Sequence, residues 1–305
     1  MKPILFMMVG LPGSGKSTKA EELKKIYEAT IYSSDKIREE LFNDINNQND
    51  NELVFQRINV LIKSDLRNGK NVIHDATNIN YKRRMDFISG LSDIECYKIC
   101  VFMATPFTDC VKNNLLRARV VPVQVIDRMY KNIFIPQIYE GWDDIIIAWN
   151  YKCKEFSIDK LFDGANGLNF IEQDNPHHSM TIGKHCIKSK DIMLEIRGEA
   201  PFAVMEAALL HDIGKEYTKS FIDCKGMPSN TAHYYQHHLV SAYNSLFYTS
   251  WYSDSMRLLI ANYIQWHMLL YSELSQKKVN KYKSLLGEEF YKNLELLHFA
   301  DEMAK

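Results

Sequence analysis

The sequence predicts two domains: an α/β domain with a parallel sheet flanked by helices, and after it an all-α domain. Three observations support this prediction. The chain has 305 residues, more than most single domains contain. In its first half, short apolar runs alternate with segments of helical periodicity, as in parallel sheets covered on both faces. Beyond Trp149 the periodicity is almost entirely helical.

The first domain is expected to begin with a buried strand at residues 3–9. A glycine-rich loop follows, and then a helix over Lys16–Tyr27. The remaining pattern predicts strands at residues 71–74 and 97–103 and helices at residues 51–68, 107–117 and 123–135.

Residues 163–176 contain two glycines, three asparagines and a proline, a composition typical of a connection between domains. We therefore expect the first domain at residues 1–155, a linker at 156–176 and the second domain at 177–305. Within the second domain, helices are predicted at residues 181–195, 200–213, 233–249, 253–270 and 288–305.

The net charge of −1 provides no global field that would attract nucleic acid, so any polyanion must be recognised locally. Candidate basic spots are residues 82–84 and the pair Arg117 and Arg119, although each also fits a solvated helix face. The apolar runs are too short to span a membrane, and the N-terminus does not resemble a signal peptide. Six cysteines without a CxxC pair favour a reduced, cytoplasmic setting.

Residues 10–17 read GLPGSGKS, the pattern of a Walker-type phosphate-binding loop. Its glycines allow successive N–H groups to face an anion, and the helix that follows adds the positive end of its dipole. Lys16 is expected to meet the β- and γ-phosphates of ATP, and Ser17 to bind Mg²⁺. The expected nucleotide contacts are Gly13, Ser14, Gly15, Lys16, Ser17 and Thr18.

Asp35 and Arg38 are three residues apart, and they share one helix face if Ser34 caps a helix there. An aspartate near the transferred phosphate can accept a hydroxyl proton, and an arginine can hold an anionic group of the acceptor. A surface ion pair has the same spacing and remains an alternative.

The first 150 residues contain a series of motifs in one order: GLPGSGKST at residues 10–18, SDKIR at 34–38, HDATNIN at 74–80, RR at 83–84, RARVVP at 117–122 and MYK at 129–131. This series resembles the kinase module of phage-type 5′-polynucleotide kinases. The resemblance implies that Asp35 is the general base on the 5′-hydroxyl, that Arg38 contacts the acceptor phosphate, and that Arg117 or Arg119 is a lid arginine on the triphosphate. Asp75 is a candidate for positioning Mg²⁺ or the loop.

Histidine is concentrated in the second half, where nine of the ten lie between His177 and His298. Imidazole and carboxylate groups are suitable ligands for Mn²⁺, Co²⁺, Ni²⁺ or Zn²⁺, and helices in a bundle can aim them at one point. Scattered core and surface histidines are the alternative interpretation. The candidate ligands lie on five predicted helices, with His211 and Asp212 adjacent on one of them: His185, His211, Asp212, His237, His267 and Asp301.

Residues 175–305 contain the motifs TxxxH at residues 181–185, LLHDIGK at 209–215, YYQHH at 234–238 and HFAD at 298–301. With these motifs the segment resembles the HD superfamily of metal-dependent phosphohydrolases. The resemblance implies that His185, His211, Asp212 and Asp301 hold the metal and that Lys215 neutralises the phosphate ester. His237 and His267 are implied as ligands of a second metal ion or as phosphate contacts.

Together the two halves indicate a bifunctional enzyme that heals nucleic-acid ends, RNA more than DNA, with a separate ligase as a possible partner. One half would phosphorylate 5′-hydroxyl ends, and the other would remove 2′,3′-cyclic phosphate or 2′/3′-phosphate. Small-molecule kinases share the loop and part of the Asp-Thr-Asn motif, so a nucleoside or sugar kinase joined to a nucleotide phosphohydrolase is the alternative. A third reading treats the second domain as a nucleotide sensor.

Overall fold

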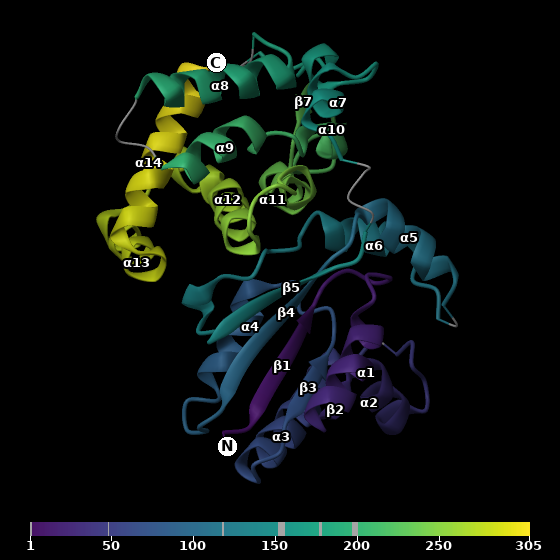
Figure 1. The fold of residues 1–305 in the computed structure, drawn as a ribbon. Coiled ribbons are helices and arrows are strands. Elements are labelled where there is room, and N and C mark those ends of the chain that lie inside the picture. The colour runs from purple at the N-terminus through teal and green to yellow at the C-terminus, as the bar shows by residue number, and fades with distance from the viewer. Residues whose placement is uncertain (1, 48, 118, 152–155, 177–178, 197–200) are drawn as a thin grey trace. The chain divides into compact units, whose positions relative to one another are not determined.

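The computed structural model describes residues 2–305 except 48, 118, 152–155, 177–178 and 197–200. The chain divides into two compact units (Figure 1). Unit 1 comprises Met1–Tyr130 and Pro136–Tyr151, and unit 2 comprises Lys131–Ile135 and Lys152–Lys305. The domain boundaries expected at residues 155 and 177 lie outside the described residues.

Unit 1 is built on a five-stranded sheet in the order β2-β3-β1-β4-β5, in which every neighbouring pair is parallel. The central strand pairs on both sides, with Phe6 opposite Ile73 on β3 and Ile99 on β4. The prediction of a parallel sheet is confirmed, although residues 30–33 and 144–149 were not predicted as strands. The strands are β1 (Ile4–Val9), β2 (Thr30–Ser33), β3 (Val72–Asp75), β4 (Tyr97–Ala104) and β5 (Asp144–Trp149).

Helices flank this sheet (Figure 1). They are α1 (Lys16–Tyr27), α2 (Ser34–Phe42), α3 (Asn51–Arg67), α4 (Tyr81–Ser89), α5 (Phe107–Leu115), α6 (Val123–Tyr130) and the 3₁₀ turn η1 (Ile138–Glu140). Helix α2 has Ser33 at its N-cap position, not Ser34, and no side-chain bond caps it.

Helix α6 ends at Tyr130, five residues before the predicted end. The next residues belong to unit 2, where Ile133 and Ile135 are fully buried. The side-chain amide of Gln265 accepts from the backbone N–H of Ile135 and donates to its carbonyl, which replaces helical bonding. Pro136 follows and disfavours helical geometry at the residue before it. The helical periodicity of the sequence therefore extends beyond Tyr130, although bonds to Gln265 and the following proline prevent a helix there.

Unit 2 is mainly helical, but the expectation of an all-α domain is wrong in one respect. Strands β6 (Ser220–Ile222) and β7 (Pro228–His233) form an antiparallel pair, and α11 begins only at His237. Its helices are α7 (Ile158–Asp163), α8 (Ile182–Glu195), α9 (Phe202–Leu210), α10 (Lys215–Thr218), α11 (His237–Tyr248), α12 (Asp254–Trp266), α13 (Gln276–Leu286) and α14 (Glu288–Met303), with 3₁₀ turns η3 (Leu168–Phe170) and η4 (His267–Tyr271).

The segment expected as a linker carries α7 and η3, and it clusters with unit 2. Leu161, Phe162 and Leu168 are buried there, and of these only Leu168 falls within residues 163–176, whose composition suggested a connection between domains. Among the described residues, no helix has the length and apolarity needed to cross a membrane.

Helix α9 stops at Leu210, three residues earlier than predicted, and residues 211–214 form a turn before α10. At Gly214 a Cβ atom would lie 2.4 Å from the carbonyl oxygen of His237 on α11. Only glycine permits this approach, which brings the His211-Asp212 turn against the start of α11.

Candidate functional site

The phosphate-binding loop joins β1 to α1, as its sequence pattern predicts. Gly13 and Gly15 have positive φ angles of 78° and 94°, which other residues rarely adopt. A Cβ atom at Gly13 would also lie 2.1 Å from the carbonyl oxygen of Cys110 on α5. The loop therefore requires glycine at position 13 for its backbone angle and for its packing.

Three polar side chains from other elements hold the loop. Thr105 Oγ1 and Asn150 Nδ2 donate to the carbonyl of Ser14 at 2.9 and 3.2 Å, and Asn113 Nδ2 donates to the carbonyl of Gly13 at 3.1 Å. These bonds pair the carbonyl oxygens of Gly13 and Ser14 with donors. Without such donors, the partial negative charge of these oxygens would repel a bound phosphate. Sequence reasoning missed all three residues, because each is an isolated polar residue outside the phosphate-binding motif: Thr105 follows β4, Asn113 lies on α5 and Asn150 follows β5.

Lys16 is the buried cation of the loop. Its Nζ donates to the carbonyl of Leu11 at 2.7 Å. Burial, with a further contribution from Arg117, outweighs the opposing charge of Asp75 and lowers the pKa of Lys16 to about 8. An anionic phosphate would favour the charged form, so this ammonium is suited to gain a phosphate partner.

Ser17 Oγ donates to Asp75 Oδ2 at 2.9 Å, which joins the loop to the end of β3. Burial raises the pKa of Asp75 from its usual value, although Lys16 and Ser17 act in the opposite direction. Hydroxyl and carboxylate oxygens are the ligands that Mg²⁺ prefers. This pair therefore fits a Mg²⁺ ion bound with nucleotide.

Asp35 lies in the first turn of α2 between two arginines. Arg38 NH1 donates to Asp35 Oδ1 at 3.1 Å, and Arg119 NH1 bonds the same oxygen. Arg38 also donates to Asn51 at 2.7 Å, and Arg119 donates to Asn46 at 3.0 Å. Because Arg38 is only 6% exposed, its pairing with Asp35 is not the solvated surface ion pair of the alternative reading.

A cleft of about 800 Å³ joins the loop to the Asp35 group. Arg117 and Arg119 both line it, but they act on different groups: Arg117 on the charge of Lys16, and Arg119 on Asp35. Its lining also includes Thr18, Phe55, Thr77, Val125, Arg128 and Met129.

Arg84 does not serve as a basic surface spot, contrary to one reading of residues 82–84. It is 1% exposed and donates to both carboxylate oxygens of Glu140, at 2.7 and 2.6 Å. A third bond goes to the carbonyl of Asn78 at 2.9 Å. Its role is to tie α4 to η1.

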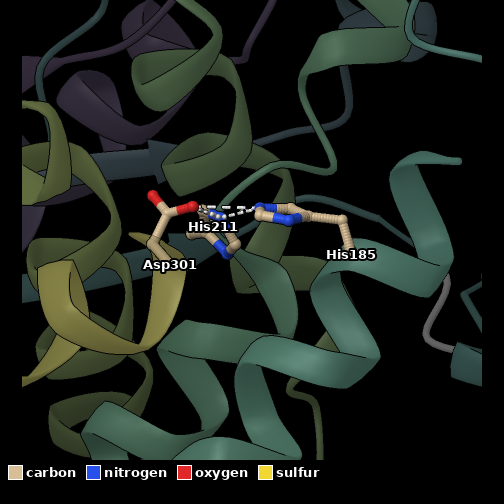
Figure 2. Close-up of side chains that lie close together, drawn as sticks. All are labelled: His185, His211 and Asp301. Atoms are coloured by element: carbon tan, nitrogen blue, oxygen red, sulfur yellow. Dashed lines mark hydrogen bonds and ion pairs between the residues drawn. The ribbon is translucent and has the colours of Figure 1, made fainter. Parts of the chain in front are cut away.

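In unit 2, three predicted ligands converge although they come from distant parts of the chain. Figure 2 shows His185 from α8, His211 after α9 and Asp301 from α14 directed toward one another. Asp301 Oδ1 lies 3.0 Å from His185 Nε2 and 3.3 Å from His211 Nε2. Asp212 Oδ2 lies 3.4 Å from each of these nitrogens. All four side chains are buried.

The hydrogen bonds of the two imidazoles define which nitrogen is available to a metal. His185 Nδ1 bonds the carbonyl of Ala304 at 3.2 Å, and His211 Nδ1 bonds the carbonyl of Ala208 at 2.8 Å. A carbonyl oxygen only accepts, so both Nδ1 atoms carry a proton, and each ring in its neutral form presents its lone pair at Nε2. These Nε2 atoms are nevertheless 3.2 Å apart. Two facing lone pairs repel unless a proton or a metal cation lies between them.

The separations also fit a single ion. Ligand bonds of about 2.1 Å place neighbouring ligand atoms about 3.0 Å apart in octahedral and about 3.4 Å apart in tetrahedral geometry. The Nε2 atoms of His185 and His211 lie 3.0–3.4 Å from each other and from the nearest carboxylate oxygens of Asp212 and Asp301. The residues present therefore fit a divalent transition metal.

A second group shares Asp212. Its Oδ1 lies 3.1 Å from His237 Nε2 and 3.9 Å from His267 Nε2, and these two nitrogens are 3.2 Å apart. Their Nδ1 atoms bond the carbonyls of Tyr234 and Ile264 at 2.8 and 2.6 Å, so the same tautomer argument applies. Asp212 thus presents one oxygen to each group, the arrangement of a bridging carboxylate.

The ionisable groups of the cluster change one another's pKa. Burial disfavours the imidazolium form of His211, but Asp212 and Asp301 outweigh it and raise the pKa of His211 to about 9. Burial also opposes the charged form of Asp212, yet Lys215 and His211 hold its pKa well below its usual range. The cluster therefore attracts either a proton or a metal cation.

Lys215 is bound within the cluster: its Nζ lies 2.6 Å from Asp212 Oδ2 and donates to Gln173 Oε1 at 2.8 Å. Gln173 is 1% exposed, and its amide nitrogen donates to the carbonyl of Met180 at 3.1 Å. Sequence reasoning missed Gln173, because it lies in the segment assigned as a linker and belongs to none of the recognised motifs.

Fold and loop together define the class of unit 1, a P-loop kinase module that uses ATP. The match of residues 5–136 to the family described as an AAA domain agrees with this assignment. Over 239 residues the chain is 26% identical to L-seryl-tRNA(Sec) kinase of Methanococcus maripaludis, a match that covers 74% of this chain and 92% of that protein.

Two solved structures show the extent of structural similarity. A chain of the Pnkp1/Rnl/Hen1 RNA repair complex is 23% identical with a TM-score of 0.38, over 42% of this chain and 42% of that chain. A gluconokinase from Sinorhizobium meliloti 1021 is 13% identical with a TM-score of 0.36, over 50% of this chain and 85% of that chain.

Proposed function

We propose that the protein is a bifunctional enzyme that heals broken RNA ends. Unit 1 transfers the γ-phosphate of ATP to a 5′-hydroxyl, and unit 2 removes a 2′,3′-cyclic phosphate or a 2′/3′-phosphate with a divalent metal. The observation that carries the proposal is the presence of both sites in one chain: an acidic residue held in the kinase cleft, and a cluster of histidines whose Nε2 atoms lie in pairs 3.2 Å apart beside buried carboxylates.

In the kinase half, Asp35 accepts the proton of the acceptor hydroxyl as that oxygen bonds to the γ-phosphorus and the bond to ADP breaks. Arg38 and Arg119 support this role because they hold the carboxylate at the cleft. Arg117, whose charge acts on Lys16, is the better candidate for the triphosphate arginine. Arg119 then belongs to the acceptor side.

An acceptor hydroxyl carried by RNA is favoured over a free nucleoside or sugar. The support comes from the seryl-tRNA kinase, whose name specifies a tRNA-borne substrate and of which the match covers 92%. The same match supports a second candidate function, in which the acceptor is the hydroxyl of an aminoacyl group on tRNA and not a 5′-end.

In the hydrolase half, His185, His211, Asp212 and Asp301 would hold one metal ion, and His237 and His267 would complete a second site with Asp212. A metal in this setting supplies Lewis-acid chemistry for phosphate-ester hydrolysis. Lys215 holds Asp212 in its ionised form and adds positive charge beside the position of the ester. The carbonyls of Ala304 and Ala208 keep the imidazoles in the required tautomer.

The kinase proposal is tested by transfer of labelled γ-phosphate from ATP to a single-stranded RNA with a 5′-hydroxyl. Lys16→Ala should abolish transfer, whereas Lys19→Ala, one turn further along α1, should retain it. Asp35→Asn should lower kcat by about 10²–10⁴-fold. Parallel reactions use a mononucleoside and seryl-tRNA as acceptors. Equal or better catalytic efficiency with either of these would overturn the 5′-end assignment.

The hydrolase proposal is tested on RNA ending in 2′,3′-cyclic phosphate or 3′-phosphate, with Mn²⁺, Co²⁺, Ni²⁺ and Zn²⁺ added in turn. His211→Ala should abolish hydrolysis and spare the kinase, and Lys16→Ala should do the reverse. Loss of both activities in either variant would contradict independent sites. Absence of hydrolysis in the metal-loaded protein would remove this half of the proposal.

A further inference from the structure

A pair of aromatic rings lies at the point where β7 leads toward α11. The rings of His233 and Tyr235 are parallel within 7°, with centroids 5.5 Å apart. His233 Nε2 lies 3.2 Å from Ser229 Oγ, which also bonds the backbone of Thr231, so the imidazole is held against β7. Tyr235 is 46% exposed and offers its ring to solvent.

This ring pair is adjacent in sequence to the histidine cluster, and Tyr234, which lies between the two rings in sequence, bonds to His237 of that cluster and to Gln173. Tyr235 precedes the ligand His237 by two residues, so their Cα atoms are at most about 7 Å apart. The carbonyl of Tyr234 accepts from His237 Nδ1 at 2.8 Å, and the Tyr234 hydroxyl donates to the carbonyl of Gln173. Lys215 Nζ lies 5.4 Å from the centre of the Tyr234 ring.

The exposure of the candidate ligands indicates that a substrate reaches the cluster on the side of His237. His237 is 7% exposed, the largest exposed fraction among its six candidate ligands, whereas His211 is fully buried. A phosphate that reaches the cluster near His237 would leave the remainder of its molecule beside Tyr235.

We propose that Tyr235 and His233 form a stacking platform for the nucleobase of the terminal nucleotide whose phosphate is removed. The inference rests on the proposed hydrolase function and specifies its substrate as a nucleotide end. Aromatic side chains stack on any base, so the platform recognises a splayed, single-stranded terminus without sequence preference. Because His233 is already held by Ser229, little ordering is lost when a base binds.

The test compares two phosphate esters in the full-length, metal-loaded protein. One is an RNA oligonucleotide with a 3′-phosphate, and the other is glycerol 2-phosphate, which has no aromatic ring. Tyr235→Ala should raise KM for the oligonucleotide by about tenfold or more and leave KM for glycerol 2-phosphate unchanged. Tyr235→Phe should retain wild-type values. Phe221→Ala removes a similarly exposed ring from β6 and serves as the control.

Two outcomes overturn the inference, and they are distinguishable. If the wild-type protein hydrolyses the oligonucleotide but Tyr235→Ala changes neither KM, or both equally, the platform is wrong and the hydrolase stands. If the wild-type protein hydrolyses no nucleotide ester while it cleaves glycerol 2-phosphate, the nucleotide substrate itself is wrong.

Discussion

Replacement of Arg84 by methionine should destabilise the protein strongly without a direct effect on the chemistry. The guanidinium makes three side-chain hydrogen bonds, two of them to Glu140, and both side chains are almost completely buried. Without Arg84, the donors to the Glu140 carboxylate among the described residues are Trp142 Nε1 and the Gln137 N–H. Removal of one partner of a buried ion pair costs about 3–5 kcal/mol. A loss of this size lowers Tm by about 6–20 °C.

Urea and thermal unfolding of the whole chain measure this effect. Arg83→Met is the matched control, because Arg83 is exposed on the same helix and its loss should cost within about 0.5 kcal/mol. The double variant Arg84→Met/Glu140→Gln should lose less than the sum of the single variants. The reasoning is refuted if Arg84→Met is as stable as Arg83→Met but phosphorylates oligonucleotides poorly, since Arg84 would then contact the polyanion.

Three further outcomes are expected. ATP affinity should fall above pH 8, by up to about tenfold per pH unit, because Lys16 is charged below its pKa of about 8 and neutral above it; Lys16→Arg should remove this slope in nucleotide titrations between pH 6.5 and 10. His267→Gln should reduce bound metal from two ions per chain to one by elemental analysis, and unchanged stoichiometry would exclude a second site there. Gln173→Leu should lower hydrolase kcat by about tenfold or more with the fold retained, because Lys215 loses an acceptor; an unchanged kcat would show that this acceptor is dispensable.

The fold was predictable where local pattern and tertiary contacts agree. Strand β1, the loop and α1 are contiguous, and each has a distinct signature. By contrast, β2 is a short, half-exposed edge strand, and α13 has no buried residue, so neither has the apolar periodicity that reveals an element. The prediction for α6 shows the opposite effect. Its helical periodicity extends to Ile135, but Gln265 bonds the backbone of Ile135 and the helix ends at Tyr130.

The candidate sites were predictable to the extent that their residues form motifs. His211 and Asp212 are adjacent, and sequence alone picked them out together with Asp301, which the structure brings within reach. Thr105, Asn113 and Gln173 act through one or two bonds to a backbone or a lysine. A single polar residue on an element leaves no periodic signal, so only the structure identifies these supports.

The excursion of residues 131–135 into unit 2 means that the chain passes between the units three times, at residues 130–131, 135–136 and 151–152. A fragment cut near residue 155 would therefore expose Ile133 and Ile135, both completely buried in the intact chain. Because the chain passes between the units at three points, neither unit can be replaced by another domain through one fusion point. We therefore expect that the two proposed activities can be separated by point substitutions but not by truncation of the chain.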